Sequence, residues 1–119
     1  MNDHVALLLQ VAVKPGELES LKALLGDLAE SSRAEAGTVV YEQSINDAND
    51  LVQSYERFAD SAAALTHLGR FGEKFGERFW AAVTPTALWV YGSPSDEVKQ
   101  VLDPFNPVYM GHFGGFSRL

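Results

Sequence analysis

The sequence predicts an α+β domain with the ferredoxin-like split βαβ plan, in which two helices cover one face of a four-stranded antiparallel sheet. Two observations predict it. Segments with strand and helix patterns follow one another as βαββαβ, and 119 residues with 46% hydrophobic and 21% charged residues suit a globular domain. We expect this domain to span residues 1–92 and to be followed by a C-terminal extension over residues 93–119.

The first strand and the first helix follow from two hydrophobic patterns. Residues Val5 to Val13 are apolar except for Gln10 and stop before Pro15-Gly16, which is typical of a central strand. From Glu17 to Glu35, leucines recur three and four residues apart, which indicates an amphipathic helix with one buried face. Gly37 stands where a left-handed helix cap is expected.

The next two strands form a predicted hairpin. Thr38 to Ile45 carries β-branched and aromatic residues, and Leu51 to Phe58 continues the pattern after a polar cluster at 46–50. Neighbouring side chains on a strand point to opposite faces, so Glu56 and Arg57 are not expected to pair with each other. We expect Glu56 to meet a partner from another strand or another subunit.

A second helix begins after Asp60, whose carboxylate can accept hydrogen bonds from the first helical turn. We expect Gly69 to bend or break this helix. Beyond it, phenylalanines recur every four residues with glycines and a tryptophan beside them. Two interpretations stay open: the aromatic stripe is core and the glycines allow close helix approach, or the stripe lines a pocket.

The last predicted strand of the domain is Thr86 to Tyr91, and it is apolar at successive positions. Such a pattern indicates a strand that is covered on both faces. Two long helices can cover only one face of the sheet. We therefore expect a homodimer in which the sheets of two copies pack face to face.

The extension carries its own signals. Ser93 to Asp96 has the form of a capping box with proline at the first helical position, which predicts a short helix to about Leu102. Residues 103–107 read as a rigid linker. The apolar segment from Val108 to Leu119 is expected to dock as an arm or an edge strand, on its own domain or on the partner subunit.

Charge and composition exclude several classes of function. A net charge of −7 without a basic cluster disfavours nucleic acid as a partner. The start of the chain lacks the basic region of a signal peptide, and its apolar run is too short to span a bilayer, so we expect a cytoplasmic protein without a membrane partner. With no cysteine and three scattered histidines, we expect no metal site.

Four short segments carry a resemblance to a known family. They are Lys14-Pro15-Gly16, Ala36-Gly37, Tyr55 to Phe58, and His67-Leu68. Over about residues 5–91 the chain resembles the antibiotic biosynthesis monooxygenase family of dimeric α+β barrels, which implies a barrel-forming dimer and cofactor-free oxygenation of quinols or anthrones. The family often has tryptophan where Phe58 stands, and the resemblance does not explain the extension.

The resemblance implies specific roles for side chains. In cofactor-free oxygenation the substrate supplies the electrons, so the protein must bind it, remove a proton and exclude water. His67 is the candidate catalytic base, because imidazole titrates near neutral pH and the family position faces a cavity between helix and sheet. The candidate substrate-binding residues are Tyr41, whose hydroxyl could hydrogen-bond a substrate oxygen, and four residues whose rings could line the cavity: Phe71, Phe75, Trp80 and Trp89.

A non-catalytic interpretation of the same residues also stays open. His67 is then a satisfied structural histidine, the aromatic side chains are plain core, and the protein is a dimeric barrel that binds a hydrophobic small molecule. The heme-degrading members of the family have an asparagine in the first strand and a late histidine in the second helical region. This chain has neither, so heme is not an expected ligand.

Overall fold

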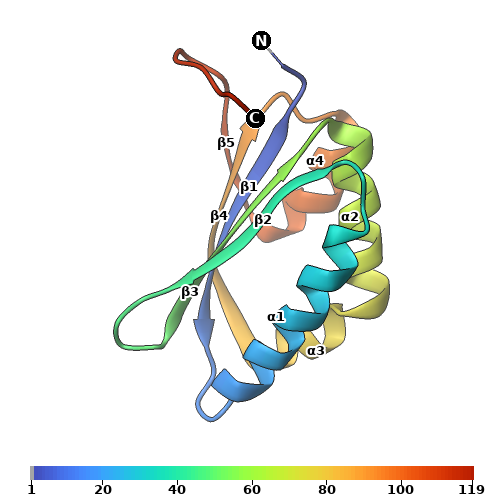
Figure 1. Ribbon diagram of the computed structural model, residues 1–119. Coiled ribbons are helices and arrows are strands. Elements are labelled where there is room, and N and C mark those ends of the chain that lie inside the picture. Colours follow the sequence, from blue (N-terminus) through green and yellow to red (C-terminus); the bar gives the residue numbers. More distant parts are fainter. Residues whose placement is uncertain (1) are drawn as a thin grey trace.

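The computed structural model describes residues 2–119, and Figure 1 shows a twisted sheet with all of its helices on one side. Residue 1, the first of the expected 1–92 domain, lies outside the described residues. In chain order the elements are β1 (Val5–Val13), α1 (Leu18–Arg33), β2 (Thr38–Ile45), β3 (Leu51–Phe58), α2 (Ser61–Lys74), α3 (Gly76–Ala82), β4 (Val83–Gly92), α4 (Asp96–Leu102), the 3₁₀ helix η1 (Asp103–Phe105) and β5 (Val108–Met110).

The strands form a single sheet in the order β2-β3-β1-β4-β5. The first four are antiparallel, so the predicted split βαβ plan is confirmed. The prediction of only four antiparallel strands is wrong, because β5 adds a parallel edge strand to β4 with Trp89 opposite Val108. A turn at Asn106, whose φ is +54°, redirects the chain along β4 after η1.

Strand alternation sorts the side chains between two faces. Leu7 of β1, Phe58 of β3 and Val90 of β4 point toward the helices and are buried. Leu21, Leu24 and Leu28 of α1 are buried against the same face of the sheet. The core therefore lies between the sheet and the helices.

Three glycines behave differently from the sequence prediction. The helix α2 continues through Gly69, which has open space around it, and ends at Lys74. Gly72 also faces open space and serves no close helix approach, whereas Gly76 is buried and a Cβ added there would lie 3.6 Å from the backbone oxygen of Phe71. Gly37 is not in the left-handed region; instead a Cβ at this position would collide with the Cβ of Ala63 in α2. Its lack of a side chain lets β2 begin directly against α2.

The predicted cap of α2 is confirmed, whereas that of α4 shifts by two residues. The carboxylate of Asp60 accepts a hydrogen bond from the backbone N–H of Ala63 at 2.8 Å. In α4 the cap is Ser95, not Ser93, and the hydroxyl of Ser95 accepts from the N–H of Val98. The N–H of Ser95 also donates to the Ser61 hydroxyl, which joins the start of α4 to α2.

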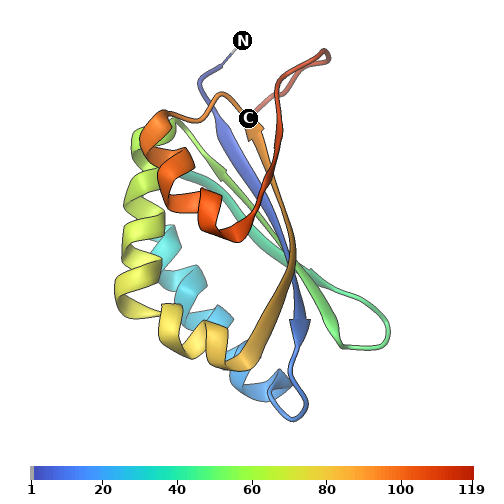
Figure 2. The ribbon, with the colours of Figure 1, turned by 180° about the vertical axis from the view of Figure 1, so that it is seen from behind.

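The second face of the sheet carries no helix in either view of the molecule (Figures 1 and 2). Leu8, Tyr55 and Trp89 lie side by side in the register and alternate with buried helix-facing neighbours, so their side chains belong to this open face. They are only partly buried in the single chain. Within residues 2–119, no helix combines the length and apolarity that a bilayer crossing requires.

Candidate functional site

A buried histidine lies between two carboxylates on the helix side of the sheet. The side chain of His67 in α2 is 3% exposed. Its Nδ1 is 2.9 Å from Oε1 of Glu35, and its Nε2 is 3.2 Å from Oε1 of Glu56. We call these residues the Glu35–His67–Glu56 cluster.

The strand β3 and the turn between α1 and β2 position the two carboxylates. Glu56 points inward because it lies two residues from both Ser54 and Phe58 on β3 and so shares their inward face, and the Ser54 hydroxyl donates to Glu56 Oε2 at 2.9 Å. Glu35 lies in the turn between α1 and β2, where the hydroxyl of Thr38 donates to its Oε1 at 2.7 Å. Both carboxylates are thus held by hydroxyl groups as well as by the imidazole.

The cluster favours the charged form of the histidine. A carboxylate can only accept hydrogen bonds, so a histidine flanked by two carboxylates donates from both ring nitrogens as the imidazolium. Burial lowers the pKa of His67, but the hydrogen bonds and charges of Glu56 and Glu35 outweigh it, and the net pKa is raised. With both nitrogens occupied, His67 has no free lone pair to take a proton from a ligand.

A pocket of about 200 Å³ opens beside this cluster, between the sheet and the helices. Its polar end contains Tyr41, Ser54, Glu56 and His67. The remaining wall is apolar and aromatic, and it is formed by Leu7, Leu9, Leu68, Phe71, Gly72, Phe79, Trp80, Leu88, Val101, Leu102 and Phe105. An apolar cavity with a few convergent polar groups is the usual form of a small-molecule site.

The Tyr41 hydroxyl remains a hydrogen-bond donor at the polar end. Burial, together with the negative charges of Glu56 and Glu35, raises the pKa of Tyr41 above its ordinary value. Its ring lies 5.4 Å from the His67 ring. A ligand oxygen at this end of the pocket would therefore meet one neutral donor and one carboxylate acceptor.

The structure brings four of the six expected site residues to this pocket, namely Tyr41, His67, Phe71 and Trp80. Phe75 stands at the break between α2 and α3 and packs against the core beneath α1. Trp89 points to the open face, because its neighbours Leu88 and Val90 occupy the helix-facing positions of β4. These two rings lie outside the pocket.

Other pocket residues escaped the sequence prediction. Glu56 was expected to meet another strand or another subunit, but it meets His67 of α2 and Ser54 of its own strand. The period of two in Ser54, Glu56 and Phe58 was a signal that these residues share the buried face. Glu35, beyond the end of α1, gave no comparable signal.

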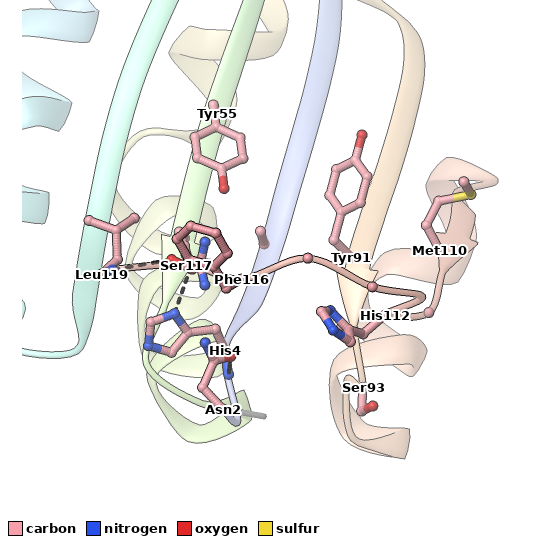
Figure 3. A pocket seen from close by; sticks show the side chains of 16 residues that line it. Asn2, His4, Tyr55, Tyr91, Ser93, Met110, His112, Phe116, Ser117 and Leu119 are labelled. Atoms are coloured by element: carbon pink, nitrogen blue, oxygen red, sulfur yellow. Dashed lines mark hydrogen bonds between the residues drawn. The ribbon is translucent and has the colours of Figure 1, made fainter.

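A larger hollow of about 630 Å³ lies on the other face of the sheet, where the C-terminal arm, residues 111–119, crosses the end of the strands. Figure 3 shows Tyr55, Tyr91 and Phe116 around it, and Arg57 Nε donates to Nδ1 of His4 there. Apart from Ala6, every lining residue is at least partly exposed. Of these two pockets, as residues 2–119 form them, the helix-side one contains a buried acid–base group and is our candidate site.

The charged groups of the site do not converge on one point. Glu35 and Glu56 approach opposite nitrogens of the His67 ring, which holds them apart. Across residues 2–119, no group of three or more histidine, cysteine or acidic side chains is placed to hold a metal ion. Hydrogen bonds through the His67 ring join the two carboxylates into one cluster.

Comparison with known proteins gives both a family and structural neighbours. Residues 4–82 match the family model described as antibiotic biosynthesis monooxygenase. No curated protein matches the chain. A putative antibiotic biosynthesis monooxygenase from Bacteroides thetaiotaomicron is 26% identical, with a TM-score of 0.66 over 72% of this chain and 85% of that chain.

Two further solved structures share the fold at lower identity. MupZ from Pseudomonas fluorescens is 22% identical and has a TM-score of 0.87 over 98% of this chain and 96% of that chain, a coverage that includes the extension. SnoaB, a cofactor-independent oxygenase from Streptomyces nogalater, is 15% identical, with a TM-score of 0.67 over 78% of this chain and 95% of that chain.

Proposed function

Because the chain belongs to the antibiotic biosynthesis monooxygenase family, we propose that it is a cofactor-independent monooxygenase that oxidises an electron-rich aromatic such as a quinol or an anthrone. One observation carries the proposal: the carboxylate of Glu56, itself nearly buried, is held by His67 at the polar end of an aromatic pocket. The solved cofactor-independent oxygenase SnoaB has the same fold.

The proposed reaction begins with proton transfer inside the pocket. The carboxylate of Glu56 takes the acidic proton of the substrate, and the hydroxyl of Tyr41 donates a hydrogen bond to the oxygen that becomes negative. This assigns the proton-accepting role, expected at His67, to Glu56. His67 acts as a positioning residue, because its Nε2 lies 3.2 Å from Oε1 of Glu56 and fixes the place of that carboxylate.

The oxidation itself needs only dioxygen and the substrate anion. The anion passes one electron to dioxygen, and the resulting radical pair forms a carbon–oxygen bond to give a peroxide. Cleavage of the oxygen–oxygen bond leaves one oxygen atom on the ring carbon, and the other departs as water with two hydrogens of the substrate. An anthrone thereby becomes an anthraquinone, and a quinol becomes a hydroxyquinone.

We also propose that the protein works as a homodimer through the open face of the sheet. Leu8, Tyr55 and Trp89 form an apolar strip on this face, and Phe113 and Phe116 of the C-terminal arm are highly exposed in the single chain. Contiguous exposed apolar surface is costly in water and marks contact sites. A second copy would cover both the strip and the arm.

Oxygen consumption by the purified, metal-stripped protein tests the proposal. The panel consists of hydroquinones, naphthoquinols and anthrones, each corrected for autoxidation. Turnover that chelators leave unchanged is the expected result. Binding of these compounds without any oxygen uptake would instead favour a non-catalytic barrel that carries a hydrophobic small molecule.

A further inference from the structure

One wall of the helix-side pocket comes from the C-terminal extension. Val101 and Leu102 of α4 and Phe105 of η1 line the pocket, although they lie beyond the residues 4–82 that match the family. The ring of Phe105 stacks on that of Trp80, with centroids 5.3 Å apart and an angle of 24° between the planes. Phe105 is 41% exposed, which places this stacked pair at the rim of the pocket.

The wall is anchored on both sides of η1. Before it, Val98 and Leu102 of α4 are buried in the same core cluster as Phe58. After it, β5 pairs with β4, and the hydroxyl of Tyr109 donates to the carboxylate of Asp103 at 2.6 Å. The position of Phe105 is therefore set by packing and hydrogen bonds on either side.

The pocket is small and partly open to solvent. Ligand pockets in proteins usually measure about 300–1,000 Å³, and an apolar cavity of about 150 Å³ holds one benzene molecule. At about 200 Å³ this pocket has room for one substituted ring or two fused rings. A ligand of three linear rings would extend to the rim, where Phe105 is one of the lining side chains.

We propose that the segment from Val101 to Phe105, here called the extension wall, limits the substrate to one or two rings and that Phe105 is a specificity-determining residue. The inference rests on the proposed function, because it takes the helix-side pocket as the substrate site. It narrows the substrate to a monocyclic or bicyclic phenol or quinol whose hydroxyl lies at Glu56. Anthrones fall outside this limit.

Binding can be measured without turnover, through tryptophan fluorescence. Of the two tryptophans in the sequence, Trp80 lines the pocket and Trp89 does not, so Trp89→Phe leaves a single reporter at the site. In that background we would titrate phenol, 2-naphthol and 2-anthrol under nitrogen. Phenol and 2-naphthol should change the emission of Trp80, and 2-anthrol should bind at least about tenfold more weakly than 2-naphthol.

Enlarging the pocket should remove this limit. Phe105→Ala is expected to raise the affinity for 2-anthrol by at least about tenfold while that for phenol changes much less. Phe113→Ala is the matched control, because it makes the same substitution in the extension at a side chain outside the pocket. Val101→Ala serves as a second enlarging variant, and circular dichroism checks that each variant folds.

Three outcomes would overturn the inference. First, the Trp89→Phe protein could bind 2-anthrol as tightly as 2-naphthol. Second, the Phe105→Ala and Val101→Ala variants could fold and still bind 2-anthrol as weakly as before. Third, none of the three compounds could bind. A protein that binds phenols with the expected size limit but consumes no oxygen would leave this inference standing. That result would count against the proposed oxygenase function alone.

Discussion

The protonation state of His67 decides what the buried cluster does chemically. Two carboxylates face its ring nitrogens at 2.9 and 3.2 Å, and their hydrogen bonds and charges outweigh the burial that would otherwise neutralise it. The cluster thus holds one positive and two negative groups in a nearly solvent-free site. Of the two carboxylates, Glu56 lines the pocket, and the proposed mechanism gives it the substrate proton.

Substituting Glu56 should abolish most of the activity. Glu56→Gln preserves the size of the side chain but removes the proton acceptor, and we expect kcat to fall by at least about a hundredfold. Glu42→Gln is the matched control, because Glu42 is exposed on β2. Oxygen uptake with an accepted quinol measures both variants, and near-normal turnover in Glu56→Gln would exclude Glu56 as the base.

The pKa of His67 should depend on Glu35. The wild-type pKa is expected above the ordinary histidine value of about 6.5, and Glu35→Gln should lower it, because one charge and one charged hydrogen bond are lost. Glu30→Gln, on the exposed side of α1, should leave it unchanged. Titration of the His67 imidazole resonances by NMR reads the value directly, and an unaltered pKa in Glu35→Gln would contradict this account of the cluster.

The same shift predicts how stability depends on pH. Because the folded-state pKa of His67 lies above that of the unfolded chain, its contribution to stability is complete below about pH 6.5. That contribution is lost as the pH rises through the raised folded-state pKa. The Tm advantage of the wild type over His67→Gln should therefore shrink across this interval, as thermal unfolding at successive pH values can show. A constant or growing advantage would mean that the charged histidine is not the stabilising form.

At the scale of elements, the packing of β2 against α2 brings the cluster together. Glu35 precedes β2, Glu56 lies on β3 and His67 lies on α2, so their side chains meet only if the start of β2 approaches α2 closely. Gly37 permits that approach, since a Cβ there would collide with Ala63. The backbone oxygen of Gly37 also accepts from the N–H of Ala59 at 2.8 Å, which joins β2 to the end of β3.

Adding a methyl group at this contact should destabilise the fold. Gly37→Ala is expected to lower the free energy of unfolding by about 1–3 kcal/mol through overpacking against Ala63. The double variant Gly37→Ala/Ala63→Gly should recover part of that loss. Gly26→Ala on α1, where the added methyl meets open space, should instead stabilise by about 0.5–1 kcal/mol. Urea denaturation measures all three, and a neutral Gly37→Ala would show that the two elements can separate at no cost.

At the scale of the whole molecule, the sheet has one face covered by helices and one open. The open face carries the partly buried strip of Leu8, Tyr55 and Trp89, and the C-terminal arm crosses its end (Figure 3). The arm exposes large apolar side chains to water, and Phe113 is fully exposed in the single chain. A second copy on this face would complete the burial that one chain leaves unfinished.

A charge placed in the strip should break the proposed dimer. Leu8→Glu is expected to shift the protein to a monomer at micromolar concentration, because a carboxylate buried between two sheets lacks a partner. Ile45→Glu, at an exposed end of β2, is the control that should stay dimeric. Light scattering coupled to size exclusion gives the mass of each variant, and a monomeric wild type would dispose of the dimer proposal.

Much of the fold was predictable because local patterns specify it. The bounds of β1, β2 and β3 were predicted to the residue, since their apolar runs stop at proline, glycine and asparagine signals. The edge strand β5 was anticipated only as one of several ways for the arm to dock. Its pairing with β4 depends on the turn at Asn106, and no local sequence pattern predicted the geometry of that turn.

The sequence by itself determined the βαββαβ order and the capping of α2 by Asp60, because each depends on residues close together in the chain. Only the tertiary structure decided that His67 meets Glu35 and Glu56, that Trp89 faces away from the pocket, and that Phe105 closes it. The physical reason is distance along the chain. A strand that is apolar on both sides does not reveal which side faces the helices, and a contact across 32 residues such as Glu35–His67 has no local signature.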